Sequence, residues 1–458
     1  MEMMYQYIWR SGALGRHFTL EDGRYAELLS PGILNTDAGP DFSAARLIID
    51  GVQWAGNIEI HVKASDWYRH RHQTDPAYDN IILHVVGIPD AQICRSDGTP
   101  VPTLVIPASE EVVGIYNSLT APSGKIRCSA RVASVPRLVS EDWFESVALE
   151  RLAQKAGRIL EEYRHLAGDW EQTCFVLLAR GMGFGINAEP FEILARNIPL
   201  RIIHHHSDNP FQLEALLLGQ AGLLDPSIRI FHEYYQQLCR EYYFLARKYS
   251  LRPMPPQLWK YARTRPQNFP HRRIVLLCKA LESGFAIARR ILDCADDTDE
   301  LRKLFDWHLS GFWHTHFSFD TPALKVSDSL GEASVNSLLI NVVAPYLYAY
   351  SIQSGNPVYG ERAINLLESL PAERNTLVRQ WESLGFHAHN ALRSQAFIQL
   401  CKCWCDAGRC LECRFGHNLI GRLVREETGA YGVSRVVGNH AREDEALFGT
   451  AEIDDYYS

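Results

Sequence analysis

The sequence lacks the long apolar run, ~18 residues or more, that a membrane-spanning helix requires, and it contains no low-complexity segment. Its first residues, MEMMYQYIWRSG, have no basic region followed by a long apolar core, so they do not form a secretory signal. We therefore expect a cytoplasmic protein with no membrane contact. Basic residues are not in excess either, since 46 lysines and arginines stand against 54 acidic residues. The net charge of -8 argues against nonspecific coating of nucleic acid, although a local basic cleft stays compatible with it.

The eleven cysteines occur in two patterns. Five of them lie within residues 401–413, and this crowding indicates a metal site. The others are scattered singly, which is typical of small core residues in a reducing compartment. The scattered cysteines are Cys94, Cys128, Cys174, Cys239, Cys278 and Cys294.

The N-terminal part, up to about residue 107, is predicted to be rich in β-strands. HFTLEDGRYAELLSPG and ARLIIDGVQWAGNIEIHV each carry Asp-Gly between apolar runs, which is the pattern of a β-hairpin. IILHVVGI is expected to be a buried strand, and QICRSDGTPVPTLVIP a further hairpin. SDWYRHRH predicts a short helix between strands. The N-terminal part is therefore expected to form a small mixed sheet with flanking helices.

From residue 140 onward the apolar residues recur at spacings of three and four, which predicts helices. The fold class is therefore α+β, with a mostly α-helical domain after the sheet. The predicted boundaries are 1–110 for the sheet domain, 111–139 for a linker, 140–424 for the helical domain with the cysteine cluster, and 425–458 for a polar tail. Within the helical part, LWKYARTRPQNFPHRR is interpreted either as a nucleic-acid groove or as a linker packed between helices.

Ionisable side chains alternate along NIEIHVKA. In a strand, Glu59, His61 and Lys63 share one face, and the isoleucines and valine between them share the other. We expect the apolar face to meet the core and the ionisable face to meet a cleft or solvent. Asp41 precedes the adjacent hairpin strand, which brings a second carboxylate next to Glu59. Two carboxylates and a backbone carbonyl form an oxygen-rich site suited to Mg²⁺ or Mn²⁺, although an exposed strand face without function would carry similar residues.

Further polar residues follow this strand. Asp66 and His72 are candidates to orient metal ligands, and Asp66 is equally suited to begin a helix. His84 lies inside an apolar strand and is interpreted as a core histidine rather than a ligand. The predicted N-terminal metal site therefore rests on Asp41 and Glu59.

Pro40-Asp41, followed after seventeen residues by Glu59-Ile60-His61, resembles the PD-(D/E)XK motif of restriction-endonuclease-like and RecB-like nucleases. The resemblance implies a restriction-endonuclease-like sheet domain, with Asp41 and Glu59 as metal ligands and His61 in the place of the motif lysine. A neutral imidazole carries less positive charge than an ammonium group at pH 7. Lys63, on the same face, is a candidate to supply the missing charge. Asp41, Glu59, His61 and Lys63 are thus the candidate catalytic residues.

A second resemblance extends over nearly the whole chain. The strings GPDF, GNIEIHVKASDW, HRH, AYDNIILHVV, RPQNFP and CLEC are similar to those of a conserved bacterial family of unknown function. That family has no assigned activity, so the resemblance identifies relatives without implying a reaction.

The cysteine cluster predicts a second metal site with the spacing Cys-x4-Cys-x2-Cys-x3-His. Its four zinc ligands would be Cys405, Cys410, Cys413 and His417. Cys401 or Cys403 is an alternative to His417. A closed site of this kind would stabilise the helical domain and perform no chemistry. An iron–sulfur cluster is the alternative occupant, since some RecB-like nucleases carry a cysteine-bound cluster.

Three hypotheses for function come from different classes. The first is a divalent-metal-dependent nuclease of the PD-(D/E)XK type, whose helical domain contacts nucleic acid or a partner. The second keeps the same fold as a noncatalytic nucleic-acid-binding or scaffold protein with a decayed site. The third is a zinc-dependent hydrolase that uses the histidine-rich face. The sequence does not indicate an oligomeric state.

Overall fold

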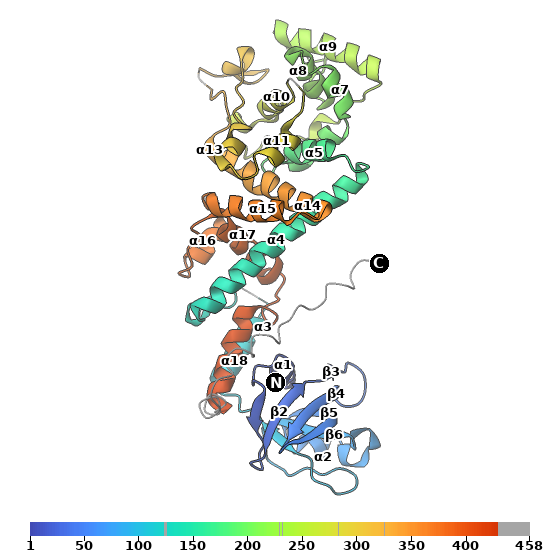
Figure 1. The fold of residues 1–458 in the computed structure, drawn as a ribbon, viewed down its shortest axis with the longest axis vertical. Helices are drawn as coiled ribbons and strands as arrows, with labels where there is room; N and C mark the ends of the chain where they lie inside the picture. The colour runs from blue at the N-terminus through green and yellow to red at the C-terminus, as the bar shows by residue number, and fades with distance from the viewer. Residues whose placement is uncertain (123–125, 229, 231, 283, 325, 429–458) are drawn as a thin grey trace. The chain divides into compact units, whose positions relative to one another are not determined.

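The structure, a computed structural model, describes residues 1–428 except 123–125, 229, 231, 283 and 325 (Figure 1). Contacts divide the chain into two compact units. Unit 1 combines Met1–Trp143 with the segment from Cys401 onward, and unit 2 is Phe144–Leu400. A mixed sheet in the N-terminal part, followed by a mostly helical region, confirms the predicted α+β class.

Unit 1 begins with a helix and a sheet and receives a further helix from the C-terminal segment. The long helix α4 (Arg137–His165) and the π-helix η8 (Leu400–Cys405) each run through a boundary between the units. The remaining elements of unit 1 are α1 (Glu2–Arg10), β1 (His17–Thr19), β2 (Tyr25–Ser30), β3 (Ile33–Leu34), β4 (Phe42–Ile49), β5 (Val52–Lys63), α2 (Asp66–Arg69), η1 (His72–Thr74), η2 (Pro76–Tyr78), β6 (Ile81–Ile88), β7 (Thr103–Val105), α3 (Glu110–Thr120), η3 (Val132–Ser134) and α18 (Arg414–Thr428).

The sheet of unit 1 has the strand order β1-β2-β4-β5-β6-β7, with β3 paired to β4. Strands β1, β2, β4 and β5 are antiparallel neighbours, whereas β5, β6 and β7 run parallel. The hairpin predicted at IIDGVQ is confirmed, because Ile49 pairs with Val52. Asp50 and Gly51 form its turn with φ angles of 47° and 81°. Positive φ at both positions is the requirement of a type I′ turn, which Asp-Gly satisfies.

The two faces of the sheet are covered by different helices. Successive residues of a strand point to opposite faces of the sheet. Val86 and Gly87 are consecutive residues of β6, so each of them faces a different side of the sheet. The space over Gly87 is filled by Tyr5 of α1, whose hydroxyl oxygen lies 2.0 Å from where a Cβ on Gly87 would stand. On the other face, Val86 packs in one cluster with Trp67 of α2. The central strand β5 contacts both helices.

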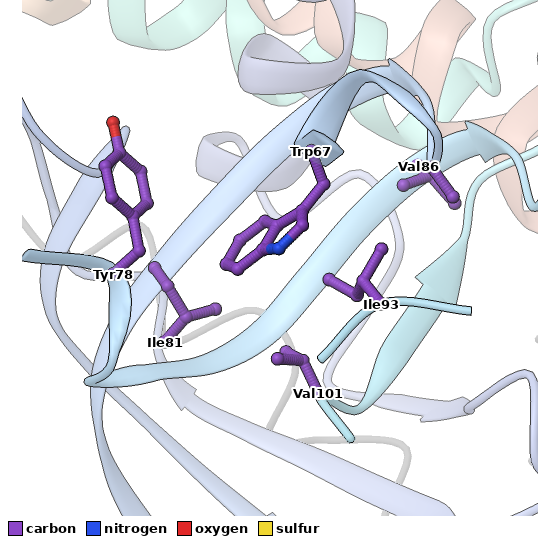
Figure 2. Close-up of a cluster of buried hydrophobic side chains, with 7 residues drawn as sticks. Trp67, Tyr78, Ile81, Val86, Ile93 and Val101 are labelled. Carbon is purple, nitrogen blue, oxygen red and sulfur yellow. The ribbon is translucent and has the colours of Figure 1, made fainter. Parts of the chain in front are cut away.

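Trp67 is the centre of the core between α2 and the sheet. Figure 2 shows its indole surrounded by apolar side chains from η2, β6 and the loop that follows β6, namely Tyr78, Ile81, Val86, Ile93 and Val101. The indole N–H group donates a hydrogen bond to the Cys94 carbonyl oxygen (3.2 Å). A large apolar ring is therefore buried without leaving its polar atom unpaired.

The segment predicted as a linker, residues 111–139, contains a helix. Helix α3 begins after Ser109, whose hydroxyl oxygen accepts a hydrogen bond from the Val112 N–H group (3.2 Å). Val112, Ile115 and Leu119 are buried at the spacing of one helix face. The prolines of this region flank α3 without interrupting it, so the linker prediction is corrected over these residues.

The C-terminal cysteine segment, predicted as part of the helical domain, packs within unit 1 instead. Helix α18 lies beside α3 (Figure 1). The Arg425 guanidinium donates to the Ala13 carbonyl oxygen (3.1 Å), and Glu427 accepts from the Ser109 N–H group (3.2 Å). These contacts join residues far apart in the sequence, so local patterns do not reveal them.

Two further predictions are changed by the structure. QICRSDGTPVPTLVIP does not form a two-stranded hairpin, because Cys94 and Pro100 make one isolated bridge and β7 pairs in parallel with β6. Residues 425–428 of the predicted polar tail belong to α18. The rest of that predicted tail lies outside the described residues.

Unit 2 consists of helices and the short hairpin β8–β9. Helices α8 and α9 approach closely at Gly219, where a Cβ would lie 2.0 Å from the Tyr242 ring. The continuous helix Glu332–Ser354 is long and apolar enough to cross a membrane, yet 56% of its 18-residue apolar window is buried, and core helices pass the same test. The elements of unit 2 are α5 (Trp170–Met182), α6 (Ala188–Arg196), α7 (Leu200–His205), α8 (Pro210–Gln220), α9 (Glu233–Tyr249), η4 (Pro256–Leu258), η5 (Pro266–Asn268), α10 (Pro270–Leu281), α11 (Ile287–Asp293), α12 (Thr298–Lys303), η6 (Gly311–His314), β8 (His316–Ser318), β9 (Thr321–Pro322), α13 (Glu332–Leu338), the π-helix η7 (Leu339–Val343), α14 (Ala344–Ser354), α15 (Pro357–Ser369), α16 (Thr376–Glu382) and α17 (Ala391–Gln399).

Candidate metal centre on strands β5 and β6

Glu59 and His61 are placed on one face of β5 by the alternation of the strand. Parallel pairing with β6 sets His84 beside Glu59. The three side chains are buried, with exposed fractions of 6% for Glu59, 1% for His61 and 0% for His84.

The sequence predicts that the ionisable face of β5 meets a cleft or solvent. The structure corrects this for Glu59 and His61, because Trp67 packs α2 onto the sheet and the chain then turns back over the strand.

His70 and His72 reach the same place because the chain turns sharply after α2. Arg71, between them, has a left-handed conformation with φ of 63°. One ligand atom from each of His61, His70 and His72 lies within 4.8 Å of the others. His61 Nε2 and His70 Nδ1 are 3.1 Å apart. This spacing brings the three imidazoles within reach of a single metal ion.

Glu59 adds a carboxylate to the three histidines. Its Oε1 lies 3.5 Å from His61 Nε2 and 3.3 Å from His72 Nε2. Its Oε2 accepts a hydrogen bond from the Asp41 N–H group (3.1 Å). The ring nitrogen Nε2 of His72 is buried, and within the described part of the chain its 3.3 Å contact with Glu59 Oε1 does not have the geometry of a hydrogen bond. A buried polar atom needs a partner, and a metal ion would supply one here.

Asp41 lies next to Glu59 and is held by protein donors. Its Oδ2 accepts a hydrogen bond from the Ile60 N–H group, and its Oδ1 accepts one from the Gln6 side-chain amide of α1, both at 2.9 Å. Burial, and then the negative charge of Glu59, raise the pKa of Asp41 to about 7. A cation bound at Glu59 would favour the ionised form of Asp41.

The buried strand histidines His61 and His84 form a pair, with His61 Nδ1 and His84 Nε2 2.8 Å apart. Burial, followed by the neighbouring histidines, lowers the pKa of His61 to about 3 and the pKa of His84 well below its usual value. Both rings are therefore neutral at pH 7. When His61 Nδ1–H donates to His84, the lone pair of His61 Nε2 is directed at Glu59 and His70. A partner that fixes the tautomer in this way is typical of ligating histidines.

Aromatic rings enclose the buried side of the group. Tyr78 stacks on His72 with ring centroids 3.7 Å apart, and Trp67 contacts the rings of His72 and His84 edge-on at 5.3 and 5.5 Å. The opposite side is open at the exposed His70. Arg69 lies at this open side, with 69% of its side chain exposed and Nη2 3.4 Å from His70 Nε2. Solvent and a ligand therefore reach the group beside His70.

Of the four candidate catalytic residues, the structure brings Asp41, Glu59 and His61 together. Lys63 ends β5 and is exposed, and its N–H group donates to Asp66 Oδ2 (3.2 Å), which ties the strand end to α2. Sequence reasoning misses His70 as a member of the group. The prediction that His84 is a core histidine agrees with its full burial, and the structure adds its contact with His61.

Two sequence signals were available for these histidines. The repeat His-Arg-His directly follows α2, and one residue in a left-handed turn lets both rings face the strand. His84 is the polar residue of the strand that pairs in parallel with β5. Each signal can be interpreted only when the fold is known, because the sequence pattern alone does not show that these histidines lie beside β5.

The predicted thiol ligands Cys405, Cys410 and Cys413 are buried in unit 1, between η8 and α18. His417 lies on α18, where its N–H group donates to the Cys413 carbonyl oxygen (2.9 Å). Burial, and then the charge of Arg425, lower the pKa of His417 to about 4. The three thiols thus gather in the turn that leads into α18.

The basic aromatic segment LWKYARTRPQNFPHRR is only partly buried in unit 2, and its Arg263 and Arg265 are exposed. Trp259, Arg272 and Arg273 are buried. The Arg272 guanidinium donates to the carbonyl oxygens of Trp313 and His316. The packed-linker interpretation therefore describes these three residues better than the nucleic-acid groove.

Unit 1 is thus a mixed-sheet domain with a candidate metal centre rich in histidine and carboxylate. The chain belongs to the family described as "Protein of unknown function (DUF2851)", whose model matches residues 2–376. The predicted membership of a family of unknown function is thereby confirmed. The match contains every residue of the candidate centre and ends before Cys401. No curated protein and no solved structure matched the chain.

Proposed function

We propose that unit 1 is a metal-dependent phosphodiester hydrolase, a nuclease related in its site to the PD-(D/E)XK enzymes. The observation that carries the proposal is the convergence of ring nitrogens of His61, His70 and His72, with Glu59 Oε1 3.5 Å from His61 Nε2 and 3.3 Å from His72 Nε2. A mixed set of imidazole and carboxylate ligands suits Mn²⁺ or Zn²⁺ better than Mg²⁺. The expected occupant is therefore Mn²⁺ or Zn²⁺.

The placement of the two acids supports the nuclease class. Asp41 directly precedes β4 and Glu59 lies on the neighbouring strand β5, and the backbone beside each acid donates to the carboxylate of the other. Strand β5 is followed by α2 and the parallel β6, which is the order that the motif resemblance implies. His61 stands at the motif lysine position with Nε2 directed at Glu59 and His70. We therefore assign His61 to the metal.

The residues take distinct roles in this assignment. The bound ion would lower the pKa of a coordinated water and neutralise charge that develops on the phosphodiester. Asp41, which a cation bound at Glu59 would keep ionised, accepts the proton of the attacking water. The water oxygen bonds to phosphorus while the bond from phosphorus to the leaving oxygen breaks. Arg69 and Arg71, both exposed beside His70, are placed to contact phosphate groups.

Cleavage assays on the full-length chain test the proposal. Supplied with Mn²⁺ or Zn²⁺, the protein is expected to cleave DNA or RNA in single- or double-stranded form. Glu59→Gln removes the carboxylate ligand and His72→Asn removes an imidazole, so each is expected to lower cleavage ~100-fold or more and to weaken Mn²⁺ binding in calorimetry. His17→Gln, at an exposed histidine on β1, is the matched control.

Two results would count against this assignment. Cleavage that persists unchanged in both Glu59→Gln and His72→Asn would contradict it. Lys63→Met tests the alternative in which Lys63 supplies the positive charge of the motif lysine. A loss of cleavage in Lys63→Met with unchanged Mn²⁺ affinity would give Lys63 the role of the motif lysine.

The three converging histidines also favour a second candidate, a zinc hydrolase of another ester. Zinc-loaded protein is to be assayed on p-nitrophenyl acetate and on bis(p-nitrophenyl) phosphate. Hydrolysis of the carboxylic ester alone would favour the second candidate, and hydrolysis of the phosphodiester alone would favour the nuclease. Salt-sensitive binding of nucleic acid without cleavage would indicate a binding or scaffold protein instead.

A further inference from the structure

A cluster of buried thiols lies in unit 1, distinct from the candidate centre on β5. Cys405 is the last residue of η8, and Cys410 and Cys413 lie in the turn that leads into α18. Their exposed fractions are 9%, 7% and 8%. The sequence predicts this group together with His417 as the fourth ligand.

Cys128 reaches the same turn from the segment that follows α3. Its neighbour Arg127 donates from Nη1 to the Gly408 carbonyl oxygen (3.4 Å) and to the Leu119 carbonyl oxygen (3.2 Å). The positive charge of Arg127 also acts on the Cys410 thiol and partly offsets the burial that raises its pKa. One arginine therefore joins the Cys128 segment to the C-terminal turn.

Electrostatic interactions link the thiols of Cys128, Cys405, Cys410 and Cys413, and Cys401 also acts on Cys405. Burial, and then the thiols of Cys413 and Cys410, raise the pKa of Cys128 to about 12. Burial also raises the pKa of Cys405, and the next largest cause is Cys128. Cys128 therefore interacts with the three C-terminal thiols of Cys405, Cys410 and Cys413.

The turn that leads into α18 has a closely packed backbone around Cys410 and Cys413. Burial raises the pKa of the Cys413 thiol, and the backbone N–H groups of Phe415 and Gly416 act in the opposite direction. A Cβ on Gly416 would lie 2.0 Å from the Cys410 carbonyl oxygen, so this close approach requires glycine. N–H groups directed at a sulfur favour its thiolate form, which is the form that binds metal.

We propose that Cys128, Cys405, Cys410 and Cys413 are the four ligands of one metal centre, with zinc as its occupant. Four thiolates form a closed tetrahedral set for zinc, and each thiol loses its proton as the ion binds. Cys128 replaces His417, which lies near Arg425 on α18. The centre is structural, because a four-ligand set leaves no position for water.

Metal analysis of the full-length chain tests this centre. Protein purified without chelator on a Glu59→Gln background is expected to hold ~1 zinc per chain by mass spectrometry. Cys128→Ser and Cys410→Ser should each lose that zinc. His417→Ala should retain it, as should the matched control Cys294→Ser, a thiol of unit 2.

Cobalt substitution keeps the test decisive if a cysteine variant does not fold. In the wild-type chain, the intensity of the sulfur-to-cobalt band counts thiolate ligands, and four are expected. Iron with acid-labile sulfide lost in Cys128→Ser would support the four-cysteine set with a cluster in place of zinc. A three-thiolate cobalt spectrum, metal loss in His417→Ala, or reduced protein that binds no metal would each overturn the proposal.

Discussion

Asp41 and Glu59 restrain each other through the backbone. Glu59 Oε2 accepts a hydrogen bond from the Asp41 N–H group, and Asp41 Oδ2 accepts one from the N–H group of Ile60. These bonds fix two acidic side chains next to each other in a partly buried place, where their like charges repel. Asp41 consequently holds its proton at pH values where an exposed aspartate is ionised.

The raised pKa of Asp41, caused first by burial and then by the charge of Glu59, predicts a pH dependence of stability in metal-free protein. The folded pKa of Asp41, about 7, lies above its ordinary value of 3.8, so the folded state holds the proton more tightly. The associated stability is present below pH ~4 and is lost as the pH rises through about 7. Asp41→Asn should remove this loss, on the order of 2 kcal/mol in the free energy of unfolding.

Urea unfolding of chelator-treated protein across this pH range measures the effect. Asp37→Asn, at an exposed aspartate shortly before Asp41, serves as the control and should keep the wild-type profile. A profile of Asp41→Asn that runs parallel to the wild type would show that Asp41 does not titrate in this window.

At the scale of elements, the β4–β5 hairpin and the alternation along β5 follow from the sequence, because an Asp-Gly turn and a period of two are local signals. The burial of Glu59 and His61 does not, because α2 and η1 must first turn back over the strand at Arg71. The position of His84 beside Glu59 depends on parallel pairing across a crossover. No local pattern encodes that register. The ligand assignments themselves stay predictions.

Trp67 is the buried side chain that holds α2 against the sheet. Its side chain is fully buried and touches the rings of His72 and His84. Trp67→Ala is expected to lower the free energy of unfolding of unit 1 by ~3–5 kcal/mol, because a large cavity remains. It should also weaken Mn²⁺ binding, because His70 and His72 lose the support that directs them to Glu59.

Chemical unfolding and calorimetric Mn²⁺ titration measure the two effects of Trp67→Ala. Tyr68→Ala changes the neighbouring aromatic residue, which is 39% exposed, and should cost less than ~1 kcal/mol. Equal losses in both variants would mean that Trp67 has no special part in holding α2.

At the scale of the whole molecule, two compact units are built from interleaved stretches of chain. Composition and periodicity predict the α+β class and the change from strands to helices. They do not predict that the cysteine segment packs with the N-terminal sheet unit, since contacts such as those of Arg127 with Gly408 and Arg425 with Ala13 span most of the sequence.

Removal of the metal from the proposed thiolate centre should therefore destabilise unit 1 and spare unit 2. In calorimetry of the full chain, chelator is expected to lower one transition by ~5 °C or more and to leave another in place. Hydrogen exchange should assign the lowered transition to α3 and α18. Cys410→Ser should show the lowered transition without chelator, and equal loss of protection in the helices of unit 2 would contradict the prediction.

The composition of unit 1 from two distant segments also bears on how the protein is made. A chain emerges from the ribosome N-terminus first, and its domains fold as their residues become available. Unit 2 is contiguous and can be completed as soon as Leu400 has emerged. The sheet of unit 1 is synthesised before unit 2, yet α3 receives its neighbour α18 only after the residues of unit 2 have been synthesised. Unit 1 therefore completes its fold later than its position at the start of this order suggests.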